Sequence, residues 1–187
     1  MDPNADIFPD GLMQKLVAHG VNGVWLHVVL RDLAPGGPDF PEFGTGHEQR
    51  IENLKKLVAR AKKHNMDIYL YMNEPRAMPH SFFKNHPDIG GASWGRNNGE
   101  RCMCTSCPKV QQWLGNSLSY LFREVPDLAG IFTITASENL TNCASRGMDI
   151  LKSCSRCSKR DYNDIIAEVN TIMERAGRPL RHLHCLW

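Results

Sequence analysis

Three short apolar segments constrain the fold of this chain more than any other feature of its sequence. They are GVWLHVVL at 23–30, DIYLYM at 67–72 and GIFTIT at 130–135. Short segments that are apolar on both faces are typical of parallel β-strands covered by helices on either side. We therefore expect the three segments to be strands of one parallel sheet, with Trp25 and Tyr71 in the core.

Helical segments alternate with these strands. Apolar residues recur at helical spacing within 12–18, 51–61, 110–122 and 165–173, and a last strand is expected at 180–186. This alternation predicts parallel strands joined by right-handed crossovers, as in an open doubly wound sheet or a (β/α)8 barrel. The first strand is not followed by the G-x-G-x-x-G spacing that is usual in dinucleotide-binding open sheets, which favours the barrel.

The loops after the strands are long, and the turns before the strands are short. The long loops cover 31–50, 73–109 and 136–160. Such asymmetry is typical of a barrel whose functional face lies at the carboxyl ends of its strands. Since a whole barrel takes roughly 200–250 residues and this chain has 187, we expect a partial (β/α)8 TIM barrel. It would be a single α/β domain over 1–187, a fragment of a longer barrel, with a cysteine-containing loop at 136–160.

Composition excludes several classes of partner. The chain is 42% hydrophobic and 22% charged, with a formal net charge of +2. Scattered charges without a basic stripe indicate no nucleic-acid partner. The sequence has no run of 18 apolar residues and starts with an acidic, proline-rich stretch, so we expect no membrane association, no secretion signal and a cytoplasmic location. Unpaired edge strands of a partial barrel would favour homo-oligomers.

Each predicted strand is followed by polar side chains that would meet at one rim of the sheet. They are Arg31 and Asp32, then Asn73, Glu74 and Arg76, then Ser137, Glu138 and Asn139. Two carboxylic acids with amide and guanidinium donors nearby suit the cleavage of a glycosidic bond. The alternative is that the acids cap the following helices or pair with the two arginines.

The segments LVARAKKHNMDIYLYMNEPRAMP and LAGIFTITASEN resemble the catalytic barrel of glycoside hydrolase family 20, the β-N-acetylhexosaminidase-like enzymes. The similarity covers about residues 10–175 and is nearest to uncharacterised bacterial proteins that carry YMNEPR, SENLTNC and a CxxC motif. It implies that Glu138 is the general acid and that Arg31 binds sugar hydroxyls. Ser137 replaces the Asp that precedes the acid in that family, so the resemblance does not imply its substrate-assisted mechanism.

A second resemblance concerns Asn73-Glu74-Pro75, which matches the Asn-Glu-Pro motif of a large clan of retaining glycosidases. We therefore take Glu74 as the second catalytic carboxyl group and assign carbohydrate binding to the six other polar residues that follow the strands. The expected activity is hexosaminidase-like glycoside hydrolysis without a required cofactor. The alternative function is a catalytically silent carbohydrate-binding or scaffolding module with a structural zinc site.

Seven cysteines, an odd number, cannot all form internal disulfides. CSRC at 154–157 has the two-residue gap that lets two thiolates bind one tetrahedral ion, and Cys143 lies eleven residues upstream. Cys104 or Cys107 would supply the fourth ligand, and we assign Cys104. The predicted set for a structural zinc ion is therefore Cys104, Cys143, Cys154 and Cys157. Free thiols, a redox pair or a catalytic metal are the alternatives.

Overall fold

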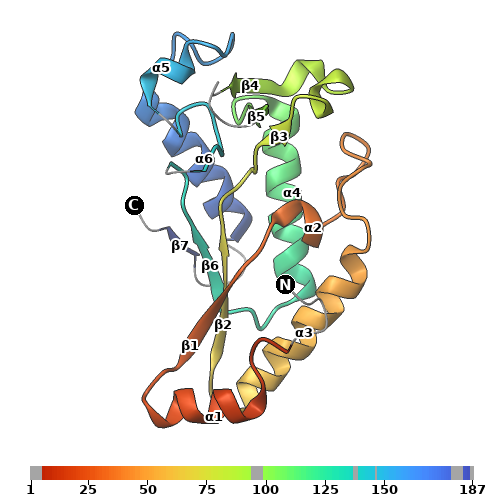
Figure 1. Cartoon of the computed structure of the whole chain (residues 1–187), viewed down its shortest axis with the longest axis vertical. Coiled ribbons are helices and arrows are strands. Elements are labelled where there is room, and N and C mark those ends of the chain that lie inside the picture. Colours follow the sequence, from red (N-terminus) through yellow and green to blue (C-terminus); the bar gives the residue numbers. More distant parts are fainter. Residues whose placement is uncertain (1–5, 94–98, 137–138, 146, 178–182, 186–187) are drawn as a thin grey trace.

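The centre of the computed structural model is a sheet of four parallel strands in the order β1-β2-β6-β7 (Figure 1). The structure describes residues 6–93, 99–136, 139–145, 147–177 and 183–185. The strands are β1 (Gly23–His27), β2 (Asp67–Met72), β6 (Gly130–Thr133) and β7 (Leu183–Cys185). The predicted parallel pairing of the three apolar segments is thus confirmed, and β2 has the predicted bounds.

Four longer helices alternate with the strands, as their apolar periodicity predicts. They are α1 (Asp10–Ala18), α3 (His47–Lys63), α4 (Pro108–Glu124) and α6 (Tyr162–Gly177). In Figure 1, α3 and α4 lie on the same side of the strands, and α6 packs against α4. α4 begins at a proline, which suits the first position of a helix because the missing N–H has no helical partner there. No helix in the described ranges is long and apolar enough to cross a membrane.

The sheet is open, and the predicted barrel is not seen in the described residues. β1 and β7 are its two edges. One face is buried beneath the helices and includes Ile68, Leu70 and Met72 of β2. The opposite face is half-exposed: Trp25 is 57% exposed, and its ring contacts that of Tyr71 at a tilted angle of 58°, with 5.2 Å between the ring centroids. The expectation that Trp25 lies in the core is wrong, because the strands are covered on one face only.

A second, antiparallel sheet lies within the predicted loop 73–109. Its strands are β3 (Met78–Pro79), β4 (Gly90–Ser93) and β5 (Glu100–Met103), in the order β3-β5-β4. Short helical segments complete the chain: α2 (Leu30–Leu33), α5 (Met148–Leu151) and the 3-10 turns Phe82–Lys84 and Pro87–Ile89. In Figure 1 the small sheet and α5 lie beyond the carboxyl ends of the parallel strands. The described parts of the loops after β2 and β6 therefore form a layer over that end of the sheet.

Candidate functional site

The carboxyl ends of three parallel strands are joined by hydrogen bonds between residues of the predicted site. The Leu30 N–H, just after β1, donates to Glu74 Oε1 over 2.7 Å. Asn139, in the loop after β6, donates from Nδ2 to Asn73 Oδ1 over 3.1 Å. The structure thus brings Asn73, Glu74 and Asn139 together with the end of β1, as adjacent parallel strands require.

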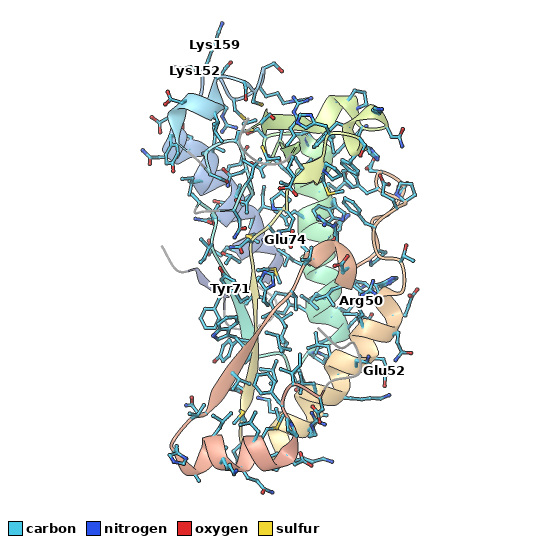
Figure 2. The ribbon with its side chains drawn as sticks, viewed as in Figure 1. Arg50, Glu52, Tyr71, Glu74, Lys152 and Lys159 are labelled. Atoms are coloured by element: carbon cyan, nitrogen blue, oxygen red, sulfur yellow. The ribbon has the colours of Figure 1, made fainter. Side chains whose placement is uncertain are left out.

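Glu74 is a buried carboxyl group directly after β2. It is 1% exposed, and Figure 2 shows it beside α2, near the upper end of β2. Its Oε2 accepts the Arg76 N–H over 3.0 Å. Burial raises the pKa of Glu74 to about 7, although the two backbone N–H donors and the charges of Arg31 and Arg76 act in the opposite direction. A carboxyl group with this pKa can give or accept a proton near neutral pH.

Arg31 and Asp32 lie in α2 and line a cavity of about 190 Å³. Arg31 Nη1 is 3.2 Å from Met78 Sδ, and Arg50 Nε donates to the Asp32 backbone carbonyl over 2.7 Å. Glu42 and Thr45 also line this cavity. The cavity is smaller than the pockets of roughly 300 Å³ or more that enclose drug-sized ligands, so it suits a single small polar group.

The two remaining residues of the predicted site, Ser137 and Glu138, lie outside the described residues. The role of Glu138 as general acid and that of Ser137 in substrate binding stay predictions. The loop that carries them is anchored on both sides, by Asn139 to Asn73 and by the side chain of Thr135, which donates to Asn170 Oδ1.

The polar residues that follow β6 mainly form hydrogen bonds within their own loop. The Thr141 hydroxyl donates to the Thr135 carbonyl over 2.7 Å, and Asn142 Nδ2 donates to the same carbonyl over 2.5 Å. Asn142 Oδ1 accepts the Ala144 N–H over 2.8 Å, and Ser145 Oγ accepts the N–H groups of Thr141 and Asn142. Sequence reasoning gave Thr141, Asn142 and Ser145 no role, because hydrogen bonding within a loop has no spacing signature.

The predicted metal ligands lie close together at this end of the molecule. The sulfur atoms of Cys104, Cys143, Cys154 and Cys157 all lie within 4.8 Å of one another, and all four side chains are buried and free of disulfides. We call these four residues the thiol cluster. Hydrogen bonds from Cys104 and Cys143 lower the pKa of Cys157 to about 7. Cys102 adjoins the cluster, and sequence reasoning gave it no role.

A scan against protein-family models finds no match, and neither does a search of curated proteins. Solved structures do match. The galactosidase domain of an α-galactosidase-sucrose kinase superposes with a TM-score of 0.56 at 14% identity, over 94% of this chain and 23% of that one. A GH36 α-galactosidase from Geobacillus stearothermophilus in complex with stachyose gives 0.56 at 12% identity, over 94% and 24%.

A hypothetical protein from Ruminiclostridium thermocellum has a comparable length. It superposes with a TM-score of 0.53 at 11% identity, over 95% of this chain and 90% of that one. By contrast, the chain spans about a quarter of the α-galactosidase chains. At such identities the likeness shows the fold alone, and the resemblance to family 20 hexosaminidases gains no support from these structures. The chain therefore has a glycoside-hydrolase-like fold, of the kind seen in GH36 α-galactosidase domains.

Proposed function

We propose that this chain contributes a catalytic carboxyl group, that of Glu74, to the hydrolysis of a glycosidic bond. The proposal depends on one observation, a buried carboxyl group with a pKa of about 7 at the joined carboxyl ends of β1 and β2. Catalytic groups cluster at that end of the strands in related α/β folds. The fold likeness to α-galactosidase domains supports the same class of reaction.

In the proposed reaction, protonated Glu74 gives its proton to the leaving glycosidic oxygen as the bond to the anomeric carbon breaks. The sequence resemblance implies that Glu138 is the general acid, whereas here Glu138 takes the role of the other carboxylate. It stabilises or attacks the positive anomeric carbon, and water completes the hydrolysis. Arg31, Asn73 and Asn139 are the nearby donors for sugar hydroxyls. The neighbours' names favour an α-galactoside as substrate, and the sequence resemblance favours an N-acetyl-β-hexosaminide.

A panel of nitrophenyl glycosides that includes both sugars tests the proposal. We expect Glu74→Gln to lower kcat by about 10²–10⁴-fold, the usual contribution of a general acid. Glu52→Gln is the matched control, because Glu52 lies on α3 away from Glu74 (Figure 2). Since protonated Glu74 is the reactive form, activity should fall as the pH rises above about 7. Equal activity of Glu74→Gln and wild type would remove Glu74 from the mechanism.

The second candidate function is a catalytically silent carbohydrate-binding or scaffolding module. The observation in its favour is that both Glu74 oxygens accept backbone N–H groups and the side chain is 1% exposed, which also suits a structural acid. Calorimetric titration with an oligosaccharide such as stachyose separates the two. Binding without hydrolysis of any glycoside in the panel would favour the module over the enzyme.

A further inference from the structure

We propose that the thiol cluster binds one structural Zn²⁺ ion, with Cys104, Cys143, Cys154 and Cys157 as its four ligands. These residues come from three segments: the stretch between β5 and α4, the loop after β6, and the turn between α5 and α6. In Figure 2, Lys152 and Lys159, which flank the CSRC segment, lie at the upper tip of the molecule, well away from Glu74. The zinc site is therefore independent of the proposed hydrolase function.

The sulfur spacing fits a tetrahedral ion. With Zn–S bonds of about 2.3 Å, the sulfurs of a tetrahedral site lie about 3.8 Å apart. Cys104 Sγ lies 3.6 Å from Cys157 Sγ and 3.7 Å from Cys154 Sγ. A disulfide would need about 2.05 Å, and an iron–sulfur cluster would hold the thiolates farther apart because inorganic sulfide lies between its iron atoms. One mononuclear ion is the arrangement that these distances fit.

Tight turns set this spacing locally. The Cys157 N–H donates to the Cys154 carbonyl over 3.2 Å, and the Ser158 N–H donates to the same carbonyl over 2.9 Å. The Cys107 N–H makes the equivalent bond to the Cys104 carbonyl over 2.9 Å. The turn at 154–157 brings both of its thiols into the cluster, which is the usual local geometry of structural zinc sites, whereas the turn at 104–107 brings only Cys104.

Backbone groups of Gly91 and Ala92 contact the Cys143 sulfur. The Ala92 N–H donates to Cys143 Sγ over 3.3 Å, and an N–H donor of this kind stabilises a thiolate. Gly91 packs directly on the sulfurs: a Cβ there would lie 2.6 Å from Cys102 Sγ and 2.8 Å from Cys143 Sγ. Four protein ligands would leave a tetrahedral ion no open position for substrate, which is typical of a structural site.

One ligand, Cys157, has polar partners beyond the thiol cluster. Cys157 Sγ lies 3.5 Å from Ser106 Oγ, and this hydroxyl donates to Glu168 over 2.7 Å. Arg160 donates to the same hydroxyl and pairs with Glu168 over 2.7 Å. Arg160 and Glu168 neutralise each other, so these groups act on Cys157 through the Ser106 hydroxyl, and such partners orient metal ligands.

Two further buried cysteines provide matched controls. Cys102 is 0% exposed and its Sγ lies 3.7 Å from Cys143 Sγ, whereas Cys107 is 4% exposed at the start of α4. Neither belongs to the set of four mutually close sulfurs. The substitutions Cys102→Ser and Cys107→Ser each remove a buried thiol from the same region without removing a proposed ligand.

Metal analysis of the chain purified without added zinc tests the site. We expect about one zinc per chain, and tetrahedral thiolate absorption bands after exchange with Co²⁺. Cys143→Ser and Cys154→Ser should weaken zinc binding by about 100-fold or more, and Cys102→Ser and Cys107→Ser by less than about threefold. If the ligand variants do not fold, chelation of wild-type zinc should expose four additional thiols to a thiol reagent. Metal-free protein, iron in place of zinc, or equal losses in Cys102→Ser and Cys143→Ser would overturn the assignment.

Discussion

At the scale of single residues, burial disfavours the ionised form of Glu74. Its pKa rises from the ordinary 4.5 to about 7 because burial disfavours the charged form. Between these two pH values, the folded chain keeps a proton that the unfolded chain has released. The free energy of unfolding should therefore fall as the pH rises from about 4.5 to about 7, by about 3 kcal/mol, and this contribution should be constant outside that range.

Glu74→Gln should remove this dependence on pH. A glutamine cannot ionise, so its contribution to stability is the same at both ends of the range. The variant should also be less stable than wild type near pH 4.5, by about 1–3 kcal/mol, since one of the two N–H donors then faces an amide NH₂. Urea denaturation across this pH range measures both effects. Glu52→Gln should keep the wild-type slope, and an unchanged slope in Glu74→Gln would contradict the assigned pKa.

A further prediction concerns the steric effect of a side chain at Gly91. Gly91→Ala would place a methyl group 2.6 Å from Cys102 Sγ and 2.8 Å from Cys143 Sγ, and both distances are shorter than van der Waals contact allows. We expect a loss of about 1–3 kcal/mol in the free energy of unfolding, the usual cost of overpacking, together with weaker zinc binding. Gly11→Ala is the control, because the space around Gly11 on α1 is open within 4 Å. There the change should be neutral or stabilise by about 0.5–1 kcal/mol, and equal effects at the two positions would refute the steric argument.

At the scale of elements, the sequence predicted what depends on local pattern and missed what depends on distant contacts. DIYLYM forms β2 over its whole predicted length because apolar strands carry a local signal. GGAS and ERCM, which form β4 and β5, carry almost none, because both are short and contain glycine or charged residues in place of an apolar strand pattern. The other two apolar segments end earlier than predicted, because GVWLHVVL forms a strand over Gly23–His27 and GIFTIT over Gly130–Thr133. The spacing of CSRC indicated two thiols for one ion, with Cys143 upstream, and left the fourth ligand open between Cys104 and Cys107. Nothing in the sequence indicated Gly91 or the hydrogen-bonded loop around Cys143.

Asn142 tests whether that loop holds its shape through side-chain hydrogen bonds. Asn142→Ala leaves the buried Ala144 N–H without its carboxamide acceptor. We expect a loss of about 1–3 kcal/mol in the free energy of unfolding and weaker zinc binding that excess zinc restores. Asn53→Ala, on the exposed side of α3, should change stability by less than about 0.5 kcal/mol. Wild-type zinc affinity in Asn142→Ala would show that the loop keeps its shape without these bonds.

At the scale of the whole molecule, the sheet is covered by helices on one face and carries aromatic side chains on the other. β1 is an edge strand, and Trp25 is the most exposed large hydrophobic residue among those described. An exposed edge with an adjoining aromatic face favours pairing with a second chain. The expectation of a homo-oligomer therefore stays a prediction, now located at β1.

Trp25→Lys should weaken self-association, because a charged side chain disfavours pairing along an edge strand. Light scattering over a range of protein concentrations measures this, and the midpoint of association should move to higher concentration. Leu12→Lys is the control, since Leu12 is an exposed apolar residue on the helix α1 and not on the edge strand. A chain that stays monomeric at every concentration, or an equal effect of both changes, would contradict the prediction.

The proposed ion joins segments that lie far apart in the sequence, since Cys104 and Cys157 are separated by 53 positions. Its four ligands can meet only after β6 has taken its place beside β2, because the loop that carries Cys143 follows β6 directly. Tight zinc capture would then be a late event in folding, completed only by chains whose strands have already been assembled in the correct order.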